Sequence, residues 1–215
     1  MRSYIVIGLG RFGSEAAIEL TSLGCEVLAM DVRSELVQQI SANVTHAVVA
    51  DARDKEVLKA LGVTDFECAI VAIGDDMAAS VLAIMNLKEL GIPHIVAKAY
   101  DETHRRVLEK LGADRVVIPE KEYADRLAKS LSSPNVLDYI ELSEDYGIVE
   151  VPVPRIWQSK TLKELNIRAK LGVNILAVRR NEKFIVSPAA DFQLLAGDIV
   201  VLLGDSLAVK AVQKL

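Results

Sequence analysis

Long apolar runs are absent from this sequence. The longest, Ala69–Ile73 and Ile199–Leu203, have the length of a strand and are bounded by Gly or Asp, whereas a membrane-spanning helix needs about 20 apolar residues. The N-terminus also lacks a charged and then apolar leader, because Leu9 is already followed by Gly10 and Arg11. We therefore expect a cytoplasmic protein.

Cysteine and histidine are scarce. Cys25 and Cys68 lie in apolar, strand-like segments, so we expect buried free thiols rather than a disulfide or a metal pair. The three histidines have no spacing typical of metal ligands, and residues 134–215 contain none. No G-x-S-x-G, H-E-x-x-H or C-x-x-C motif occurs. The sequence therefore lacks the common reaction centres, which favours a sensor or regulator over an enzyme.

Basic charge is not concentrated anywhere. The chain has 25 Lys and Arg against 30 Asp and Glu, a net charge of −5, and its basic runs are no longer than the pair Arg179–Arg180. Nucleic-acid binding proteins usually carry a basic patch, so we expect no nucleic-acid partner. Apolar residues make up 51% of the chain and charged residues 26%, which excludes a disordered chain.

The first two-thirds of the chain alternates apolar strand segments with helical segments. Tyr4–Ile7 is a continuous apolar run, typical of a strand buried on both faces. Six such strands separated by helices predict an α/β fold, a Rossmann-like doubly wound parallel sheet with strand order 3-2-1-4-5-6. The expected strands are Tyr4–Ile7, Glu26–Asp31, Ala47–Val49, Cys68–Ile73, Ile95–Ala97 and Val116–Ile118, and Asp75 or Asp76 is expected to cap the helix Met77–Leu90.

The pattern of predicted elements changes at Pro119. Glu120–Leu131 is predicted to be a helix with an apolar stripe, and Ser132–Asn135 is the best candidate for a linker. We therefore expect two domains, 1–133 and 134–215, of which the second is a smaller α+β unit. Its expected strands are Ile148–Val153, Ile175–Val178, Phe184–Val186 and Ile199–Leu203, with short helices around Thr161–Leu165 and Leu207–Val212.

The glycines of Gly8–Gly13 match G-x-G-x-x-G between a buried strand and a helix, and Asp31 stands at the end of the next strand. Gly8 allows the tight turn, Gly10 lets a diphosphate approach the backbone, and Gly13 lets the helix pack on the strand. The helix N-terminus offers free N–H groups to phosphate. Asp31 can accept hydrogen bonds from ribose hydroxyls. This pattern predicts a nucleotide site.

Other candidate residues follow the carboxyl ends of the strands, where ligands sit in such sheets. Asp51 and Ala52 come after the third strand, where an adenine usually packs, although an ordinary loop is the alternative. Lys98 ends the fifth strand and is either a phosphate ligand or a solvated lysine. The remaining candidates are Phe12, Val32, Ile73 and Gly74.

Arg11 bears on which nucleotide binds. Backbone N–H groups satisfy most of a dinucleotide diphosphate, whereas a guanidinium at the same helix tip suits a more anionic group such as the γ-phosphate of ATP. The alternative is a surface arginine in the first helical turn.

The order and spacing of several motifs resemble the RCK regulatory subunits of Ktr and Trk potassium transporters, and most closely the KtrA/KtrC type. The resemblance covers essentially the whole chain. The matching motifs are Ile5–Gly13 (I-V-I-G-L-G-R-F-G), Thr45–Val48, Val71–Gly74, Val107–Ala113, Ile118–Lys121, Ile167–Lys170 and Ser187–Pro188.

This resemblance implies an RCK-N domain with a crossover helix at 1–133 and an RCK-C domain at 134–215. It implies activation by ATP, inactivation by ADP, and dimers that assemble into an octameric ring on the inner face of the membrane, beneath a KtrB/KtrD-type potassium-translocating subunit. It further implies that Arg11 approaches the γ-phosphate across the dimer interface. Glu120 is implied as a ligand of Mg²⁺ or Ca²⁺ between subunits, with a helix cap as the alternative.

The resemblance also implies a second ligand, cyclic di-AMP, at a two-fold interface of the second domain. The matching positions are Arg168, Asn174, Ile175 and Pro188. An arginine fork suits a phosphodiester, and apolar walls suit a base. The alternative is that Arg168 and Asn174 simply mark a helix end and a strand start.

One departure concerns the ligand. Close relatives have Asn-Ala-Thr where this chain has Asp51-Ala52-Arg53, and Trk-type relatives take NAD(H). We expect ATP and ADP, with NAD(H) as the alternative. A nicotinamide-dependent oxidoreductase is disfavoured because no catalytic His or Tyr-Lys pair is present and the second domain is small. A nucleotide-responsive regulator of a different transporter stays open.

Overall fold

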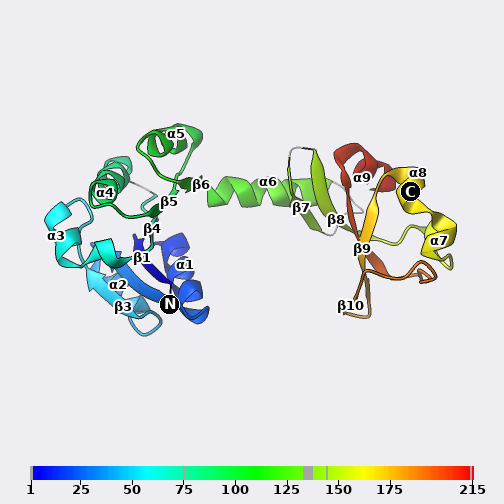
Figure 1. Cartoon of the computed structure of the whole chain (residues 1–215), viewed down its shortest axis with the longest axis horizontal. Helices are drawn as coiled ribbons and strands as arrows, with labels where there is room; N and C mark the ends of the chain where they lie inside the picture. Colours follow the sequence, from blue (N-terminus) through cyan, green and yellow to red (C-terminus); the bar gives the residue numbers. More distant parts are fainter. Residues whose placement is uncertain (1, 75, 133–137, 144, 214) are drawn as a thin grey trace. The chain divides into compact units, whose positions relative to one another are not determined.

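The computed structural model describes residues 2–74, 76–132, 138–143, 145–213 and 215 (Figure 1). It divides into two compact units, Met1–Glu120 and Lys121–Leu215, so the division falls near the start of helix α6 (Pro119–Ser132). The domain boundary expected at 133/134, the linker after Ser132 and the candidate cap Asp75 lie outside the described residues. That boundary therefore stays a prediction.

The first unit contains a six-stranded parallel sheet with the order β3-β2-β1-β4-β5-β6. The predicted fold class and strand order are confirmed. Ile5 and Ile7 face one core and Val6 the other, as expected of a continuous apolar run. The strands are β1 (Ser3–Ile7), β2 (Glu26–Asp31), β3 (His46–Val49), β4 (Cys68–Val71), β5 (His94–Lys98) and β6 (Arg115–Val117).

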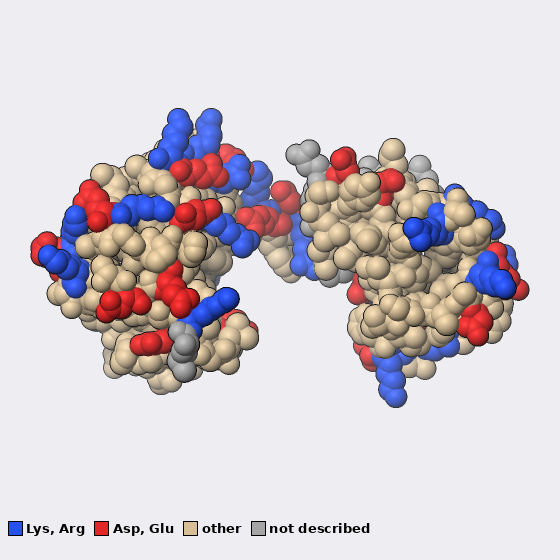
Figure 2. Space-filling view, viewed as in Figure 1, with Lys and Arg blue, Asp and Glu red and all other residues tan. Residues whose placement is uncertain are grey.

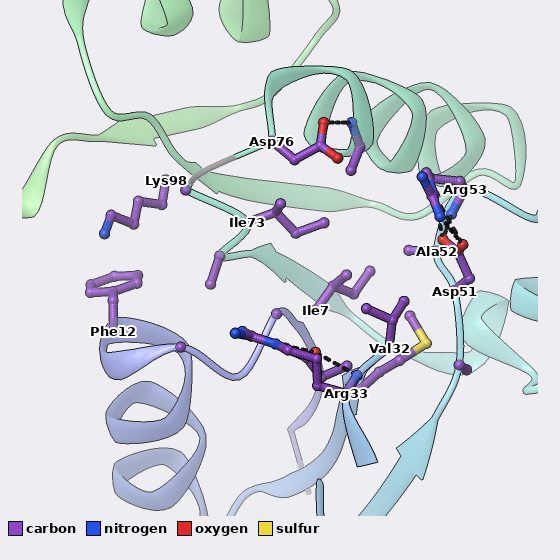
Figure 3. A pocket seen from close by; sticks show the side chains of 18 of the residues that line it. Ile7, Phe12, Val32, Arg33, Asp51, Ala52, Arg53, Ile73, Asp76 and Lys98 are labelled. Carbon is purple, nitrogen blue, oxygen red and sulfur yellow. Dashed lines mark hydrogen bonds and ion pairs between the residues drawn. The ribbon is translucent and has the colours of Figure 1, made fainter. Parts of the chain in front are cut away.

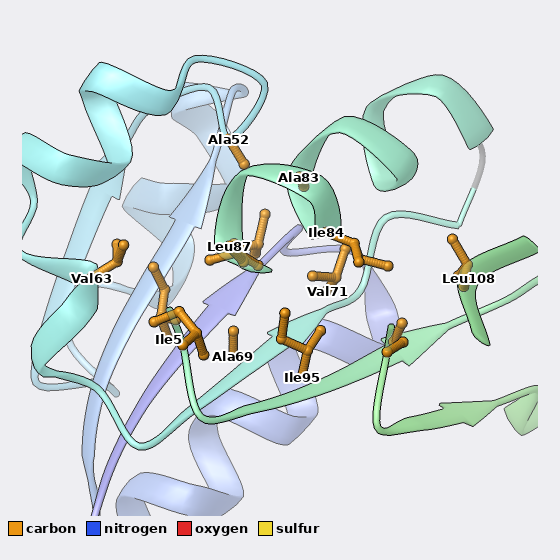
Figure 4. Close-up of a cluster of buried hydrophobic side chains, with 14 of the residues drawn as sticks. Ile5, Ala52, Val63, Ala69, Val71, Ala83, Ile84, Leu87, Ile95 and Leu108 are labelled. Carbon is orange, nitrogen blue, oxygen red and sulfur yellow. The ribbon is translucent and has the colours of Figure 1, made fainter. Parts of the chain in front are cut away.

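Helices cover both faces of this sheet. Residues of α1 and α2 share a core with Val6, whereas α3, α4 and α5 contribute to the core that contains Ile5 and Ile95 (Figure 4). Asp76 caps α4 by accepting a hydrogen bond from the Ala79 N–H at 2.9 Å. The bounds are α1 (Arg11–Ser22), α2 (Ser34–Ile40), α3 (Lys55–Ala60), the 3₁₀ helix η1 (Val63–Asp65), α4 (Met77–Glu89) and α5 (Glu102–Lys110).

The second unit contains a five-stranded antiparallel sheet with the order β10-β9-β11-β8-β7. Its core includes Trp157, Leu194 and Leu202. The sequence analysis missed β7 and α8. The bounds are β7 (Asp138–Glu141), β8 (Tyr146–Pro152), η2 (Arg155–Trp157), α7 (Leu162–Leu165), α8 (Ile167–Leu171), β9 (Asn174–Arg180), β10 (Lys183–Val186), β11 (Ile199–Asp205) and α9 (Ser206–Gln213).

Two local expectations changed. Strand β4 ends at Val71 rather than Ile73 because residues 72–74 leave the sheet and pass close to Gly8. Cys25 and Cys68 are free, as predicted, but half-buried rather than fully buried. In the part of the chain that the structure describes, no helix has both the length and the apolar character needed to cross a membrane.

Candidate nucleotide site

Two of the three motif glycines are required by the fold itself. Gly8 has φ +94°, and a side chain there would press on the backbone of Ala72. At Gly13 a Cβ would overlap the carbonyl oxygen of Gly8, so only glycine lets α1 pack this closely on the loop. A Cβ on Gly10, in contrast, would meet no atom within 4 Å. Packing therefore does not explain why this position is a glycine.

The start of α1 faces this open space. Gly10 is its N-cap and offers no side-chain cap, and the first turn contains no acidic residue. The first N–H groups of a helix have no partner within it. They form, with the positive end of the helix dipole, a site suited to phosphate oxygens.

Asp31 lies at the end of β2 and touches the same loop. One carboxylate oxygen, Oδ2, accepts the Leu9 N–H at 2.7 Å, and the other, Oδ1, accepts the Arg33 N–H at 2.9 Å and its Nε–H at 3.2 Å. Burial by itself would raise the pKa of Asp31, but these hydrogen bonds from Leu9 and Arg33 outweigh it and hold the pKa below its usual value. The carboxylate is thus ionised and has lone pairs left for hydroxyl donors.

The segment after β3 forms another wall of the site. Arg53 donates to the Asp51 carboxylate, with Nη2 2.6 Å from Oδ2, and this bond lowers the pKa of Asp51. The Asn86 side chain, from α4, donates to the carbonyl oxygens of Ala52 and Arg53 at 3.0 and 2.9 Å. Ala52 itself is buried. A helix side chain therefore fixes the backbone where the adenine was expected.

Lys98 and Glu120 pair with each other. Lys98 Nζ lies 2.7 Å from Glu120 Oε1, and this hydrogen bond lowers the pKa of Glu120, with a smaller contribution from the charge of Arg11. A Cβ at Gly74 would lie 3.6 Å from Nζ of Lys98, an ordinary van der Waals contact, so packing does not require a glycine there. Two predicted ligands, one for phosphate and one for a metal ion, are thus partners within one chain.

These groups surround one cavity of about 400 Å³ (Figure 3). In Figure 3 Lys98 and Phe12 lie on one side of it and the Asp51–Arg53 pair on the opposite side. The predicted residues that line it are Gly8, Gly10, Arg11, Phe12, Asp31, Val32, Asp51, Ala52, Ile73, Gly74, Lys98 and Glu120. Gly13 stands behind the wall, where it allows the close packing.

Several lining residues were not predicted from the sequence. Arg33 was not expected there, nor were Asp76 and Ala79 from the first turns of α4. A cation two residues after the acid that ends β2 was the available signal for Arg33. Among the described residues that line the cavity, none is His, Cys or Ser. The charged side chains that line the cavity can bind a ligand through charge and hydrogen bonds.

The four predicted residues of the second unit lie on three segments. Arg168, on α8, and Asn174, the first residue of β9, are exposed. Ile175 packs partly against the second core, and Pro188 is half-buried after β10. Because Val186 pairs with Ala177 and the Ser187 N–H bonds the Leu176 carbonyl, the chain at Pro188 runs beside the start of β9. The fold thus brings Pro188 near Ile175.

The parallel sheet, glycine loop and charged cavity place the first unit in the Rossmann-like class of nucleotide-binding folds. Two family models match the chain, the TrkA-N domain over residues 4–119 and the TrkA-C domain over residues 147–215. The chain belongs to this TrkA family of RCK proteins, of the Ktr type.

Relatives in other organisms support this membership. The chain is 42% identical to the Ktr system potassium uptake protein C of Bacillus subtilis, over 99% of this chain and 96% of that protein. It is 44% identical to protein A of the same system, over 97% and 94% respectively. The Ktr system potassium uptake protein A of Vibrio alginolyticus is 34% identical over 97% and 96%.

Solved structures share the fold. The RCK domain of the GsuK channel superposes with a TM-score of 0.66 at 20% identity, covering all of this chain and 47% of that one. The GsuK channel bound to NAD gives 0.65 at 20% identity, covering 100% and 39%. This chain therefore spans less than half of those channel chains.

Proposed function

We propose that this protein is the cytoplasmic, nucleotide-binding regulatory subunit of a Ktr-type potassium uptake system and not an enzyme. It would associate with the inner face of the membrane through a KtrB/KtrD-type translocating subunit. ATP would activate and ADP would inactivate. Two relatives at more than 40% identity over nearly their whole length are potassium uptake proteins, which supports this role.

The cavity supports a division of labour around an adenine nucleotide. The backbone from Gly8 to Gly13 would take the diphosphate, Asp31 the ribose hydroxyls, and the segment at Asp51 and Ala52 the adenine. Arg11 would approach a third phosphate. The observation that carries this proposal concerns Gly10. A Cβ there would meet open space, so packing does not require a glycine at this position.

Calorimetry on the full chain tests which nucleotide binds most tightly. We expect ATP and ADP to bind more tightly than NADH, because a third phosphate gains more from Arg11 than a neutral nicotinamide does. Arg11→Ala should weaken the binding of ATP by about 1.5–3 kcal/mol and the binding of ADP by less. Arg106→Ala, an exposed arginine on α5, serves as the matched control. Tighter binding of NADH than of ATP would contradict the proposal.

A Mg²⁺ or Ca²⁺ ion between subunits is a separate part of the proposal. Among the described residues no group of three or more His, Cys, Asp or Glu is placed to hold a metal, so Glu120 would need a second Glu120 from a partner chain. Oxygen ligands suit a hard cation, and two close carboxylates repel each other unless a cation lies between them. The Lys98 ammonium would have to release Glu120 on metal binding.

The quaternary proposal rests on α6. Tyr123, Leu127 and Leu131 are exposed on it, at 67%, 46% and 76%. We propose that this stripe packs against a second copy in a homodimer and that dimers assemble into an octameric ring. Light scattering should give a species larger than a monomer at micromolar concentration, and a monomer with and without nucleotide would refute it.

Cyclic di-AMP is the ligand proposed for the second unit, at a two-fold interface formed around Arg168, Asn174, Ile175 and Pro188. Equilibrium binding to the full chain should give one ligand per two chains. Arg168→Ala should abolish it, whereas Arg155→Ala, another exposed arginine of that unit, should not. Absence of binding would remove this ligand and leave the first site untouched.

The physiological role is tested by potassium uptake. A transport-deficient host that expresses the translocating subunit should take up potassium faster when this chain is co-expressed, and Arg11→Ala should remove that gain. Equal uptake with and without the chain would point to a different transporter.

A further inference from the structure

A fully buried histidine connects α5 to α4, the helix whose first residues line the cavity. His104 lies in the first turn of α5, has 0% of its surface exposed, and does not line the cavity itself. Its Nε2 is 2.8 Å from Oγ of Ser80, a buried residue of α4. The proposed function does not use this pair.

The hydrogen bonds identify which nitrogen carries the proton. The Ser80 hydroxyl donates to the Met77 carbonyl at 2.9 Å, so Nε2 of His104 must be the donor to Ser80 Oγ. Within the described chain, Nδ1 of His104 has no hydrogen-bond partner although it is buried. A neutral imidazole fits this environment, whereas a protonated one would bury a second N–H with no acceptor.

The charged groups on the adjoining segments do not supply that acceptor. Asp101 favours protonation of His104, but its Oδ1 accepts the His104 backbone N–H at 2.7 Å, and burial lowers the pKa of the imidazole despite it. Asp76 caps α4. Arg105 pairs with Glu102 and Glu109, 2.8 and 3.8 Å away. The Tyr100 ring lies against the imidazole, with ring centroids 4.7 Å apart.

The Ser80–His104 hydrogen bond joins α4, whose first residues line the cavity, to the helix that follows the lining strand β5. Asp76 and Ala79, in the N-terminal turns of α4, line the cavity next to Ser80. Lys98 ends β5 and lines the cavity too, in the strand that leads into α5. Figure 3 shows Asp76 and Lys98 on neighbouring segments of this wall. The bond therefore holds the α4 turns against the segment that follows β5.

We infer that His104 is a positioning residue of the nucleotide cavity: while neutral it fastens the N-terminal turns of α4, and its protonation releases them. Acid and bound nucleotide then act on these turns in opposite directions. The inference about nucleotide rests on the proposed function, whereas the effect of acid does not.

Linkage sets the size of the effect. A released His104 regains an ordinary pKa near 6.5. At pH 5.5, one unit lower, protonation favours the released state by up to about tenfold, and at pH 7.5 it has almost no effect. Asp31 and Asp51, whose pKa values are lowered, stay ionised throughout this range.

Hydrogen exchange of the full-length protein tests this, with protection factors normalised for the intrinsic rate at each pH. Between pH 7.5 and 5.5 we expect the amides of residues 79–83 to lose several-fold, up to about tenfold, in protection in the wild type. His104→Gln keeps a neutral donor for Ser80 and should show no such loss. His46→Gln, which changes an exposed histidine, should behave like the wild type. Saturating ADP should restore protection at pH 5.5 in the wild type.

Each outcome has one meaning. An equal pH-dependent loss in His104→Gln, or no loss in the wild type, overturns the inference. If His104→Gln does not fold, Ser80→Ala decides, since it should already lose protection in residues 79–83 at pH 7.5 while α2 keeps its own. Unchanged protection there in Ser80→Ala also overturns the inference. A normal acid effect with no change on adding ADP at either pH would count against the proposed nucleotide site alone.

Discussion

Among the described residues, each unit buries one aspartate that pairs with an arginine, and the two pairs are built differently. Asp198, 1% exposed, binds Arg180 through two parallel bonds of 2.7 Å and also accepts the Leu195 N–H at 2.8 Å. Asp31, 7% exposed, receives one side-chain bond, from Arg33 Nε at 3.2 Å. The Asp198–Arg180 pair is therefore closed to further partners, whereas the Asp31–Arg33 pair is open to them.

The arginines explain that difference. Arg180 also donates to the Gln193 carbonyl at 2.8 Å, and its guanidinium stacks over the Phe192 ring, 4.9 Å from the centroid. The Arg33 side chain is 62% exposed and lines the cavity. A buried carboxylate is thus structural where its partner is saturated, and available to a ligand where its partner faces a cavity.

The largest effect should come from breaking the closed pair. Asp198→Asn leaves Arg180 without its counter-charge, and we expect a loss of about 3 kcal/mol in the free energy of unfolding, near the lower end for broken buried pairs because Arg180 is partly exposed. Chemical denaturation measures it. Asp191→Asn, an exposed aspartate nearby in sequence, is the control and should change little. Equal losses in both variants would contradict the comparison.

The same pair predicts a pH dependence. The hydrogen bond from Arg180 lowers the pKa of Asp198 in the folded state. The unfolded state therefore binds the proton more tightly, so the stabilisation is complete above the unfolded pKa of about 3.9 and is lost as pH falls through the folded value. The difference in unfolding free energy between the wild type and Asp198→Asn should stay constant from pH 7 to 5 and shrink below pH 4.

The second largest effect on stability is expected at Gly13, and it should distinguish this glycine from Gly10 in the same cavity loop. Gly13→Ala forces a Cβ into the Gly8 carbonyl and should cost about 2 kcal/mol of stability. Gly10→Ala meets open space and should change stability by less than about 0.5 kcal/mol, yet it should weaken ADP binding. Denaturation and calorimetry on both variants test this, and normal ADP binding by Gly10→Ala would show that its position is not a ligand contact.

Breaking the open pair, Asp31–Arg33, should cost less stability than breaking the closed pair. Asp31→Asn removes a charged acceptor of the Leu9 N–H, and we expect about 1–2 kcal/mol of lost stability together with weaker ADP binding. Asp198→Asn, in contrast, should leave ADP binding unchanged. A variant of Asp31 that loses stability but binds ADP normally would make both carboxylates structural.

A small effect on stability is also expected at Glu120. Its pair with Lys98 is exposed on the Glu120 side, at 65%, so Glu120→Gln should cost less than about 1 kcal/mol. Its effect should appear with divalent ions. Mg²⁺ or Ca²⁺ should raise the melting temperature of the ATP form more than that of the ADP form, and Glu120→Gln should abolish this extra shift. Retention of the shift would refute the metal site.

Much of the first unit could be predicted from the sequence because its signals are local. The apolar run Tyr4–Ile7, the glycines that follow and Asp31 specify strand, turn and second strand within about thirty residues. The strand order was predicted from the arrangement common to doubly wound nucleotide-binding sheets. In the second unit, β7 and α8 were missed because both are short. Ile167–Leu171 spans hardly more than one turn, and no helical period can be recognised over that length.

The sequence by itself determined the alternation of strands and helices, the glycine loop and the acid at the end of β2, because each depends on neighbours along the chain. Only the tertiary structure decided the partners. Lys98 meets Glu120, Asn86 holds the backbone at Ala52, and Arg180 closes on Asp198. These pairs join residues 18 to 34 positions apart. Their contacts depend on how the sheets and helices pack, which no local pattern of residues encodes.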